Sequence, residues 1–225
     1  MSRLLGVLFI SAFFSFTNLN AQERGNILLS GSFKYKVSET LPEEFSLLGS
    51  IATSGYENTQ FAVLPRVGYF INENTAIGLG LGYSRNKIEL TFDTEKETVI
   101  SPRLIIEPFV RQYKSLGEKT KLFFDVSVSY ETGTDKDKYT DSDFPEDNST
   151  SEIENTGFGL AVAPGFAYKI ADRIALEISI GKLSYSKLES KPKGAPSDFA
   201  IKSSSYGLDL DLKHVMLGVE FYLSR

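Results

Sequence analysis

The sequence lacks cysteine entirely and contains a single histidine, His214. A chain without thiols forms no disulfide, offers no thiolate to a metal and is not lipidated through an N-terminal cysteine. Beyond its first residues it has no run of 18 consecutive apolar residues, which argues against a helical membrane span. Its 24 basic and 29 acidic residues give a formal net charge of −5. This mild acidity argues against a nucleic-acid-binding surface.

Residues 1–21 have the pattern of a secretory signal peptide. Arg3 supplies a positive charge, Leu4 to Phe16 is almost wholly apolar, and Ala21 is a small residue before the expected cleavage point. The apolar run is short for a membrane-spanning helix, so an uncleaved anchor is the weaker interpretation. We therefore expect removal of residues 1–21 after export, and one domain over residues 22–225.

Three segments share one pattern, in which a strand, a short turn and an alternating strand follow one another. The turns lie near residues 71–75, 114–119 and 170–173. Repeated hairpins of this kind predict a meander of antiparallel strands that closes on itself or nearly does so. Longer polar connections lie near residues 38–58, 85–100, 131–155 and 184–206.

Side chains alternate with a period of two in each predicted strand, which indicates one apolar face and one mixed face. The clearest case sets Ile77, Leu79, Leu81 and Tyr83 against Gly78, Gly80, Gly82 and Ser84. The eight strands predicted in this way lie near residues 27–37, 61–70, 77–84, 104–111, 122–130, 159–168, 174–181 and 217–223.

Two architectures fit this alternation. In a soluble sandwich or barrel the apolar face is inside, whereas in a transmembrane barrel it faces lipid and the mixed face fills the lumen. Three features favour the membrane barrel: small residues on the mixed face, alternating short and long connections, and tyrosines near the strand ends. These tyrosines are Tyr35, Tyr69, Tyr83, Tyr130 and Tyr168.

The sequence therefore predicts an all-β fold whose strands cross a membrane. We expect a closed, antiparallel, up-and-down, eight-stranded transmembrane β-barrel with short periplasmic turns and long extracellular loops.

The last predicted strand carries Gly218, Phe221 and Leu223, a glycine followed three and five positions later by an aromatic and an apolar residue. In this spacing and in its strand arrangement the chain resembles the small eight-stranded bacterial outer-membrane barrels, the OmpA/OmpX-like group. The resemblance implies a location in the outer membrane of a bacterium, contact with the lipids of that membrane, and recognition of the last strand by the barrel-insertion machinery. It implies no single activity, because such barrels serve as structural proteins, adhesins, binders and occasional enzymes.

Seven charged residues fall on the mixed face of the predicted strands. They are Lys34, Arg66, Glu107, Arg111, Asp125, Glu177 and Glu220. A charge buried alone is very costly, so we expect these residues to pair with one another inside the lumen. Eight strands leave an interior just large enough for side chains, which favours a plugged lumen over a proton or ion pathway.

His214 is the natural candidate for catalysis, with Asp209, Asp211 and Ser203–Ser205 nearby in sequence. No nucleophile elbow and no metal-ligand spacing accompanies it. We therefore expect no catalysis, no cofactor and no metal, and a structural or surface-interaction role through the loops. The alternatives are a lipid-modifying barrel enzyme that uses His214 and a soluble periplasmic barrel that binds an apolar ligand.

Segment 131–155 is the most polar part of the chain, and its acidic residues far outnumber its two lysines, Lys136 and Lys138. Such a composition predicts a solvated, flexible loop. If this loop binds a surface ligand, the sequence does not identify it.

Overall fold

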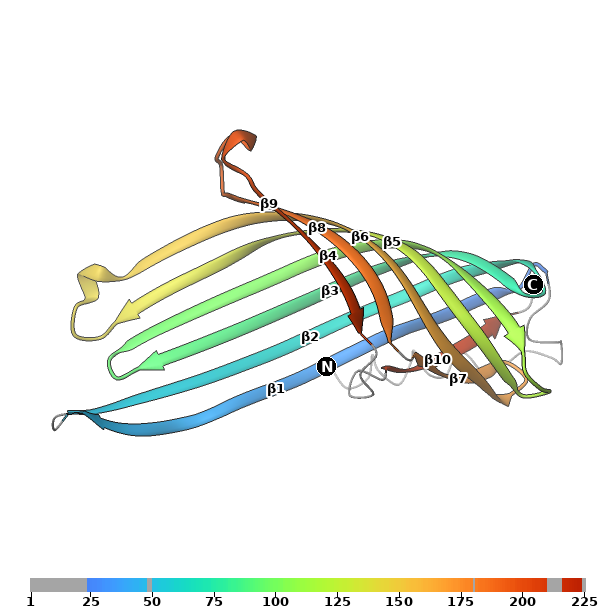
Figure 1. The fold of residues 1–225 in the computed structure, drawn as a ribbon, viewed down its shortest axis with the longest axis horizontal. Coiled ribbons are helices and arrows are strands. Elements are labelled where there is room, and N and C mark those ends of the chain that lie inside the picture. The colour runs from blue at the N-terminus through green and yellow to red at the C-terminus, as the bar shows by residue number, and fades with distance from the viewer. Residues whose placement is uncertain (1–23, 48–49, 180, 210–215, 224–225) are drawn as a thin grey trace, which may run out of the picture.

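The computed structural model describes residues 24–47, 50–179, 181–209 and 216–223 (Figure 1). The expected signal peptide and His214 lie outside these ranges. The strands are β1 (Ile27–Leu47), β2 (Ser50–Asn72), β3 (Thr75–Phe92), β4 (Glu95–Ser115), β5 (Thr120–Asp141), β6 (Ser149–Ala171), β7 (Ile174–Ser179), β8 (Lys182–Pro192), β9 (Ile201–Asp209) and β10 (Met216–Leu223). Two short 3-10 helices, η1 (Pro145–Asp147) and η2 (Ser197–Phe199), lie in hairpin ends. Within the described residues, no helix is long and apolar enough to cross a membrane.

Eight of the strands form a ring of antiparallel pairings that runs from β1 to β7, then through β10 back to β1. The sheet has ten strands because β8 and β9 form an additional hairpin. β8 pairs with residues 153–162 of β6, and β9 pairs with β8. β7 and β8 are separated at Gly181, which has a φ of +75° and therefore allows a sharp change of direction. The β8–β9 hairpin consequently leaves the direction of the long strands (Figure 1).

The ring is joined unevenly. β1 and β2 pair along nearly their whole length, whereas β1 and β10 pair only from Ile27 to Leu29. Within the described residues, β1 beyond Leu29 has no second strand partner, and β9 pairs with β8 alone.

The segments expected to be long loops are mostly strand. β3 and β4 meet at a tight turn at Asp93, and β5 and β6 continue to Asp141 and from Ser149. The prediction of a flexible loop over 131–155 was wrong, because polarity was taken for irregularity. Threonines, β-branched residues and cross-strand ion pairs such as Lys136–Glu152 support strands whose two faces are both polar.

Prolines inside the strands coincide with gaps in the ladders. Pro65 is missing from the β2–β3 ladder, Pro108 from the β4–β5 ladder, and Pro164 from the ladders that join β6 to β7 and β8. Each proline still pairs with the strand on its other side. Because proline has no N–H to donate, it fits where one neighbouring ladder is interrupted.

The outward face of the ring carries an apolar band with aromatic residues at its edge. On β5 the outward residues run from Leu122 to Tyr130 and then change to Thr132, Thr134 and Lys136. The apolar part covers about 26 Å of strand at a rise of about 3.3 Å per residue. The change from apolar to polar outward residues falls at similar positions on the neighbouring strands. Tyr130, the last apolar outward residue of β5, pairs with the apolar Ile106 on β4 and Phe158 on β6. The long strands thus extend well beyond the band on one side.

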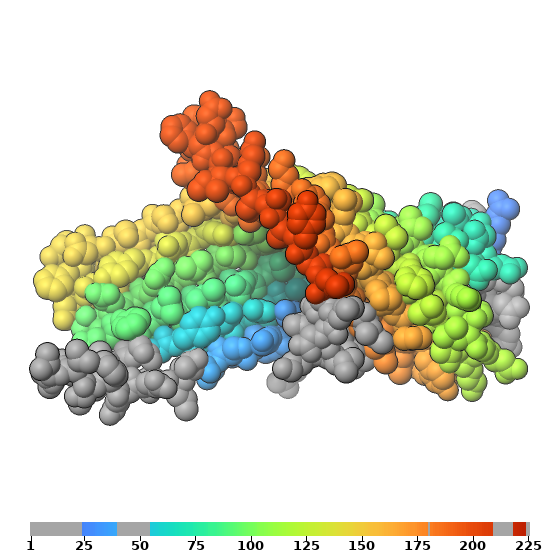
Figure 2. Space-filling model, viewed as in Figure 1, coloured from blue at the N-terminus to red at the C-terminus, as the bar shows by residue number. Residues whose placement is uncertain are grey.

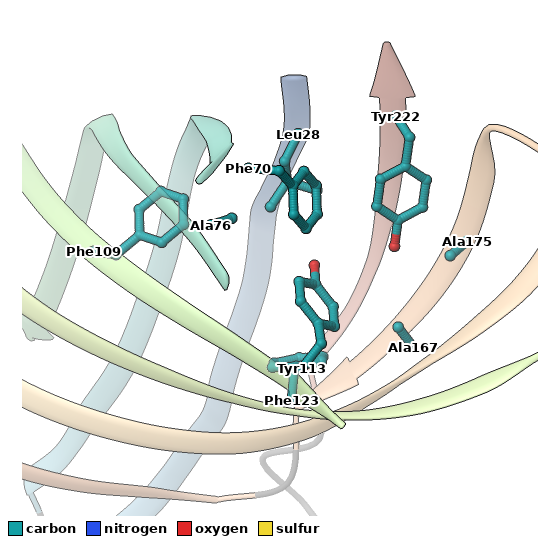
Figure 3. Close-up of a cluster of buried hydrophobic side chains, with 9 residues drawn as sticks. All are labelled: Leu28, Phe70, Ala76, Phe109, Tyr113, Phe123, Ala167, Ala175 and Tyr222. Atoms are coloured by element: carbon teal, nitrogen blue, oxygen red, sulfur yellow. The ribbon is translucent and has the colours of Figure 1, made fainter. Parts of the chain in front are cut away.

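The inward face holds an apolar cluster at the end of the ring with the short turns (Figure 3). Its members are Leu28, Phe70, Ala76, Phe109, Tyr113, Phe123, Ala167, Ala175 and Tyr222. Ring centroids of Phe70 and Tyr113 lie 5.8 Å apart, and Tyr113 also packs edge-on against Phe123. Glycine is required beside them, because a Cβ on Gly165 would lie 2.7 Å from the carbonyl oxygen of Ile178. These aromatic rings close the interior at this end.

An arginine at Leu79 or Val126 would place a charge within the apolar band, where these side chains are 44% and 51% exposed. Each substitution is expected to lower the free energy of unfolding in lipid vesicles by about 2–4 kcal/mol. Thr91→Arg, on the outward face beyond the band, is the matched control and should change it by less than about 1 kcal/mol. Urea unfolding followed by gel mobility measures all three. Equal effects at the three positions would contradict a lipid-facing band.

Candidate functional site

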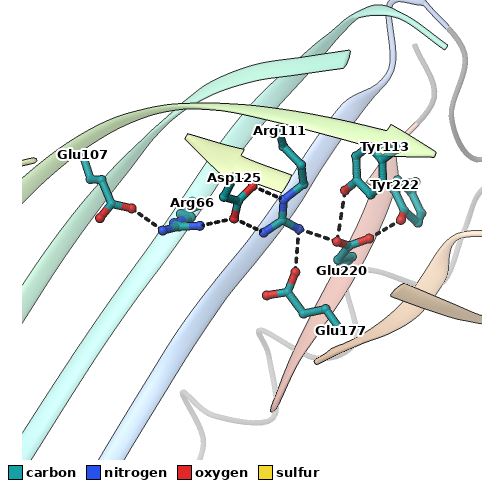
Figure 4. A network of polar contacts seen from close by, with 8 residues as sticks. All are labelled: Arg66, Glu107, Arg111, Tyr113, Asp125, Glu177, Glu220 and Tyr222. Atoms are coloured by element: carbon teal, nitrogen blue, oxygen red, sulfur yellow. Dashed lines mark hydrogen bonds and ion pairs between the residues drawn. The ribbon is translucent and has the colours of Figure 1, made fainter. Parts of the chain in front are cut away.

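A layer of charged side chains crosses the interior above the aromatic cluster (Figure 4). Arg66 comes from β2, Glu107 and Arg111 from β4, and Asp125 from β5. Glu177 on β7 and Glu220 on β10 complete it. All occupy the inward phase of their strands, because alternate residues of a strand point to the same face.

Arg111 is the centre of this layer and is only 1% exposed. Its Nε and Nη2 donate to the two carboxylate oxygens of Asp125, both at 2.6 Å. Its Nη1 donates to Glu177 at 2.6 Å and also to Glu220. The guanidinium lies 4.1 Å from the ring centroid of Phe123, so its face is covered as well. One side chain therefore links β4 to β5, β7 and β10.

Arg66 extends the layer toward β2. Its Nη1 donates to Asp125 at 3.0 Å and its Nη2 donates to Glu107. At the other end, the Tyr113 hydroxyl donates to Glu220 at 3.0 Å, and the Tyr222 hydroxyl donates to the second oxygen of Glu220. The fully buried Glu220 carboxylate therefore has a donor at each oxygen, as a buried charge requires.

The structure brings together six of the seven charged residues that the sequence placed in the lumen. Lys34 is inward in phase but exposed, and within the described residues it forms no ion pair. Sequence reasoning missed two members, Tyr113 and Tyr222. Tyr113 was missed because β4 was expected to end at Arg111; the alternation Phe109, Arg111, Tyr113 is the signal that extends it.

The carboxylates outnumber the guanidinium groups in this layer by four to two. In the described part of the chain, no cluster of three His, Cys, Asp or Glu residues is placed to hold a metal ion. The arrangement suits a packed, cross-linked interior.

The residues of the expected C-terminal signal lie on β10. Gly218 allows close approach of the Glu177 side chain, whose Cγ would lie 2.7 Å from an added Cβ. Phe221 and Leu223 are half-buried and pair with Leu29 and Ile27 of β1. These residues therefore also stand where the ring returns to its first strand.

A second group of ion pairs joins the hairpins beyond the apolar band. Glu152 on β6 pairs with Lys136 on β5 at 3.2 Å and with Lys193, which follows β8, at 2.5 Å. Hydrogen bonds from Lys193 and Lys136 lower the pKa of Glu152 below its usual 4.5, and the Glu152 carboxylate raises the pKa of Lys193 above 10.5. We call Lys136, Glu152 and Lys193 the hairpin clasp.

Arg111→Ala is expected to lower the free energy of unfolding by about 3–5 kcal/mol, because it leaves buried carboxylates without their cation. Arg103→Ala is the matched control, since Arg103 forms a similar pair with Asp135 in a half-buried position. It should cost clearly less. Urea unfolding in vesicles compares the two. Adding Asp125→Asn to Arg111→Ala should recover part of the loss, and equal costs for both arginines would contradict a central role for Arg111.

The hairpin clasp predicts a pH window. The lowered pKa of Glu152 means that its stabilisation is complete above about pH 4.5 and is lost as the pH falls through the folded pKa. The raised pKa of Lys193 means that its contribution is lost only above about pH 10.5. Carbon-13 NMR titration should find the Glu152 pKa below its usual value. Lys193→Met or 1 M salt should raise it; an unchanged value in both would rule out the clasp.

A family model and several solved structures match this chain. The model of the outer membrane protein β-barrel domain matches residues 7–221. Solved structures that are similar include OprG from Pseudomonas aeruginosa (14% identity, TM-score 0.43), which matches 92% of this chain and 100% of its own. The attachment invasion locus protein Ail from Yersinia pestis is also similar (10% identity, TM-score 0.38) and matches 89% of this chain and 99% of its own. A major outer membrane protein from Thermus thermophilus is similar too (15% identity, TM-score 0.39) and matches 88% of this chain and 98% of its own.

No curated protein matches the sequence. The family model nevertheless spans most of the chain. The chain therefore belongs to the outer membrane protein β-barrel domain family, whose members lie in the bacterial outer membrane.

Proposed function

We propose that this protein is a structural or surface-interacting component of the outer membrane that neither conducts solutes freely nor catalyses a reaction. The observation that carries the proposal is the buried Arg111 layer, which joins strands from different sides of the ring. With the aromatic cluster beneath it, this layer leaves no wide aqueous path through an eight-stranded ring. A role outside the bilayer then falls to the hairpins beyond the apolar band.

We propose the following topology in the membrane. The short turns face the periplasm and the long hairpins face the outside, the usual arrangement of outer-membrane barrels. Unpaired backbone groups are costly in lipid, so β1 and β10 are expected to pair beyond Leu29 and close the barrel. The outward apolar band supports this placement, because its aromatic edge suits the boundary between lipid and water.

Three kinds of partner follow from this placement. Outer-membrane lipids contact the apolar band. The barrel-insertion machinery recognises the last strand through Gly218, Phe221 and Leu223, as the resemblance to small barrels suggests. A surface ligand of unknown identity is reached through the hairpins β3–β4, β5–β6 and β8–β9.

In planar bilayers the purified protein is expected to show no stable, porin-sized conductance, because the Arg111 layer and the aromatic cluster fill the lumen. A porin measured in the same bilayers serves as positive control. Arg66→Ser combined with Glu107→Ser trims the half-buried edge of the layer and should increase small, brief openings. A steady, large conductance of the unaltered protein, reproduced across preparations, would overturn the proposal.

The β5–β6 hairpin is expected to be dispensable for folding. Replacing residues 136–152 by Asn-Gly joins Asp135 to Ile153, which pair in the ladder, through a turn suited to hairpins. The shortened protein should still insert and show heat-modifiable migration, but lose any surface binding. In intact cells, added protease should cut the native hairpin near η1 and spare a cleavage site placed at Asp172–Arg173. Cutting at the latter in intact cells, or failure of the shortened protein to fold, would refute this topology.

A further inference from the structure

A cavity of about 380 Å³ lies in the interior above the charged layer, on the side of the long hairpins. Arg66, Glu107 and Asp125 form its floor, and serine hydroxyls from several strands form much of its wall. These serines are Ser32, Ser127, Ser129, Ser179, Ser184 and Ser186. The space-filling view shows the inner face of the sheet as a trough that runs under the β8–β9 hairpin (Figure 2).

The cavity exists because one strand supplies almost no side-chain volume. The inward residues of β6 at this level are Gly157, Gly159, Ala161 and Ala163. They pair across the ladder with Glu131, Ser129, Ser127 and Asp125 of β5. Small residues therefore stand opposite the polar side chains of this part of β5. The side chains of Glu131 and Ser129 lie over Gly157 and Gly159, where an added Cβ would come within 2.5 Å of them.

Ser127 and Glu131 are polar residues of the wall whose side chains make no hydrogen bond or ion pair with another described side chain. Ser127 is only 6% exposed and lines the cavity. The half-buried Glu131 carboxylate forms no ion pair there. Both groups are therefore available to form hydrogen bonds with a molecule in the cavity.

The charge at the Glu131 end of the cavity is negative. Among the described residues that line the cavity, Lys182 is the only cation without an ion pair. The positions of the two charges can be compared along β6: Leu183, next to Lys182, pairs with Val162, whereas Glu131 pairs with Gly157. Five residues along β6 separate these levels, about 16 Å at the usual rise per residue. Arg66 in the floor already donates to Glu107 and Asp125. The arginine is therefore neutralised, and Glu131 is not.

We propose that this cavity binds a small organic cation with several N–H donors, such as a linear diamine. Each ammonium group has three donors. Ser127 and Glu131 lie about 13 Å apart along β5, so one end of the diamine donates to the Glu131 carboxylate and the Ser129 hydroxyl, and the other end reaches toward Ser127. A bare metal ion fits poorly, since the described residues hold no cluster of three metal-ligating side chains. A wholly apolar ligand would leave the charged groups and hydroxyls of the wall without partners.

The test uses the full-length mature protein in detergent micelles at low salt, titrated calorimetrically with 1,4-diaminobutane. The uncharged 1,4-butanediol, which has the same length, is the matched ligand. We expect saturable binding of the diamine, at least about tenfold weaker binding to Glu131→Gln, and none of the diol. Glu89→Gln, on the outward face of β3, should bind as the unaltered protein does.

Three results would overturn the proposal: no heat of binding, equal binding of diol and diamine, or an unchanged affinity in Glu131→Gln. Ala161→Leu provides an independent variant that fills the cavity and leaves every charge in place. It should also abolish binding, whereas retained binding would place the diamine on the charged surface of the hairpins. Heat-modifiable migration shows that each variant is folded. A negative result here would leave the proposed non-conducting surface role intact, because that role rests on the layer below.

Discussion

The burial of Arg111 among carboxylates from three other strands is the constraint on which the interior depends. A guanidinium that is 1% exposed requires fixed acceptors, and the bidentate pair with Asp125 together with Glu177 and Glu220 supplies them. Arginine suits this role because its planar fork reaches several carboxylates at once. These bonds tie together strands that are far apart in sequence, so they order the ring as well as fill it.

The interior is divided into three layers of different chemistry. Aromatic rings close the end with the short turns, the charged layer lies above them, and a hydroxyl-lined cavity follows. Residue size decides where each layer begins. Large inward side chains such as Phe123 require glycine on the neighbouring strand, whereas the small side chains of Ser127 and Ser129 stand opposite alanine and glycine. Packing is therefore dense where charges are buried and loose toward the long hairpins.

The outward face follows the solvent that it meets. Apolar residues give way to threonine, lysine and glutamate where the aromatic edge ends, yet the strands continue without a break. Backbone ladders and cross-strand pairs such as those of Glu152 maintain the sheet beyond the apolar band. Among the described strands, β8 and β9 leave the direction of the long strands. The change of direction starts at Gly181, because glycine adopts a positive φ at low cost.

Alternation with a period of two determined, from the sequence alone, the strands, their lipid-facing phase and the inward phase of Arg66, Arg111 and Glu177. This succeeded because each residue's face depends only on its neighbours along the same strand. The sequence misled where both faces are polar, as in 131–155, since hydropathy no longer separates strand from loop. The predicted strand at 174–181 ends close to where β7 does, but the β8–β9 hairpin was missed because residues 184–206 were expected to form a connection.

Only the tertiary structure decided which charges meet. Lys34 and Arg66 both point inward, but Arg66 lies level with Glu107 and Asp125 whereas Lys34 stays exposed. The position of a side chain along the axis of the ring, relative to side chains of other strands, depends on the register of every ladder between them. The sequence of one strand does not encode that register. For the same reason the cavity beside Ser127 emerged only from the structure, because it is the register of β5 on β6 that sets small residues opposite polar ones.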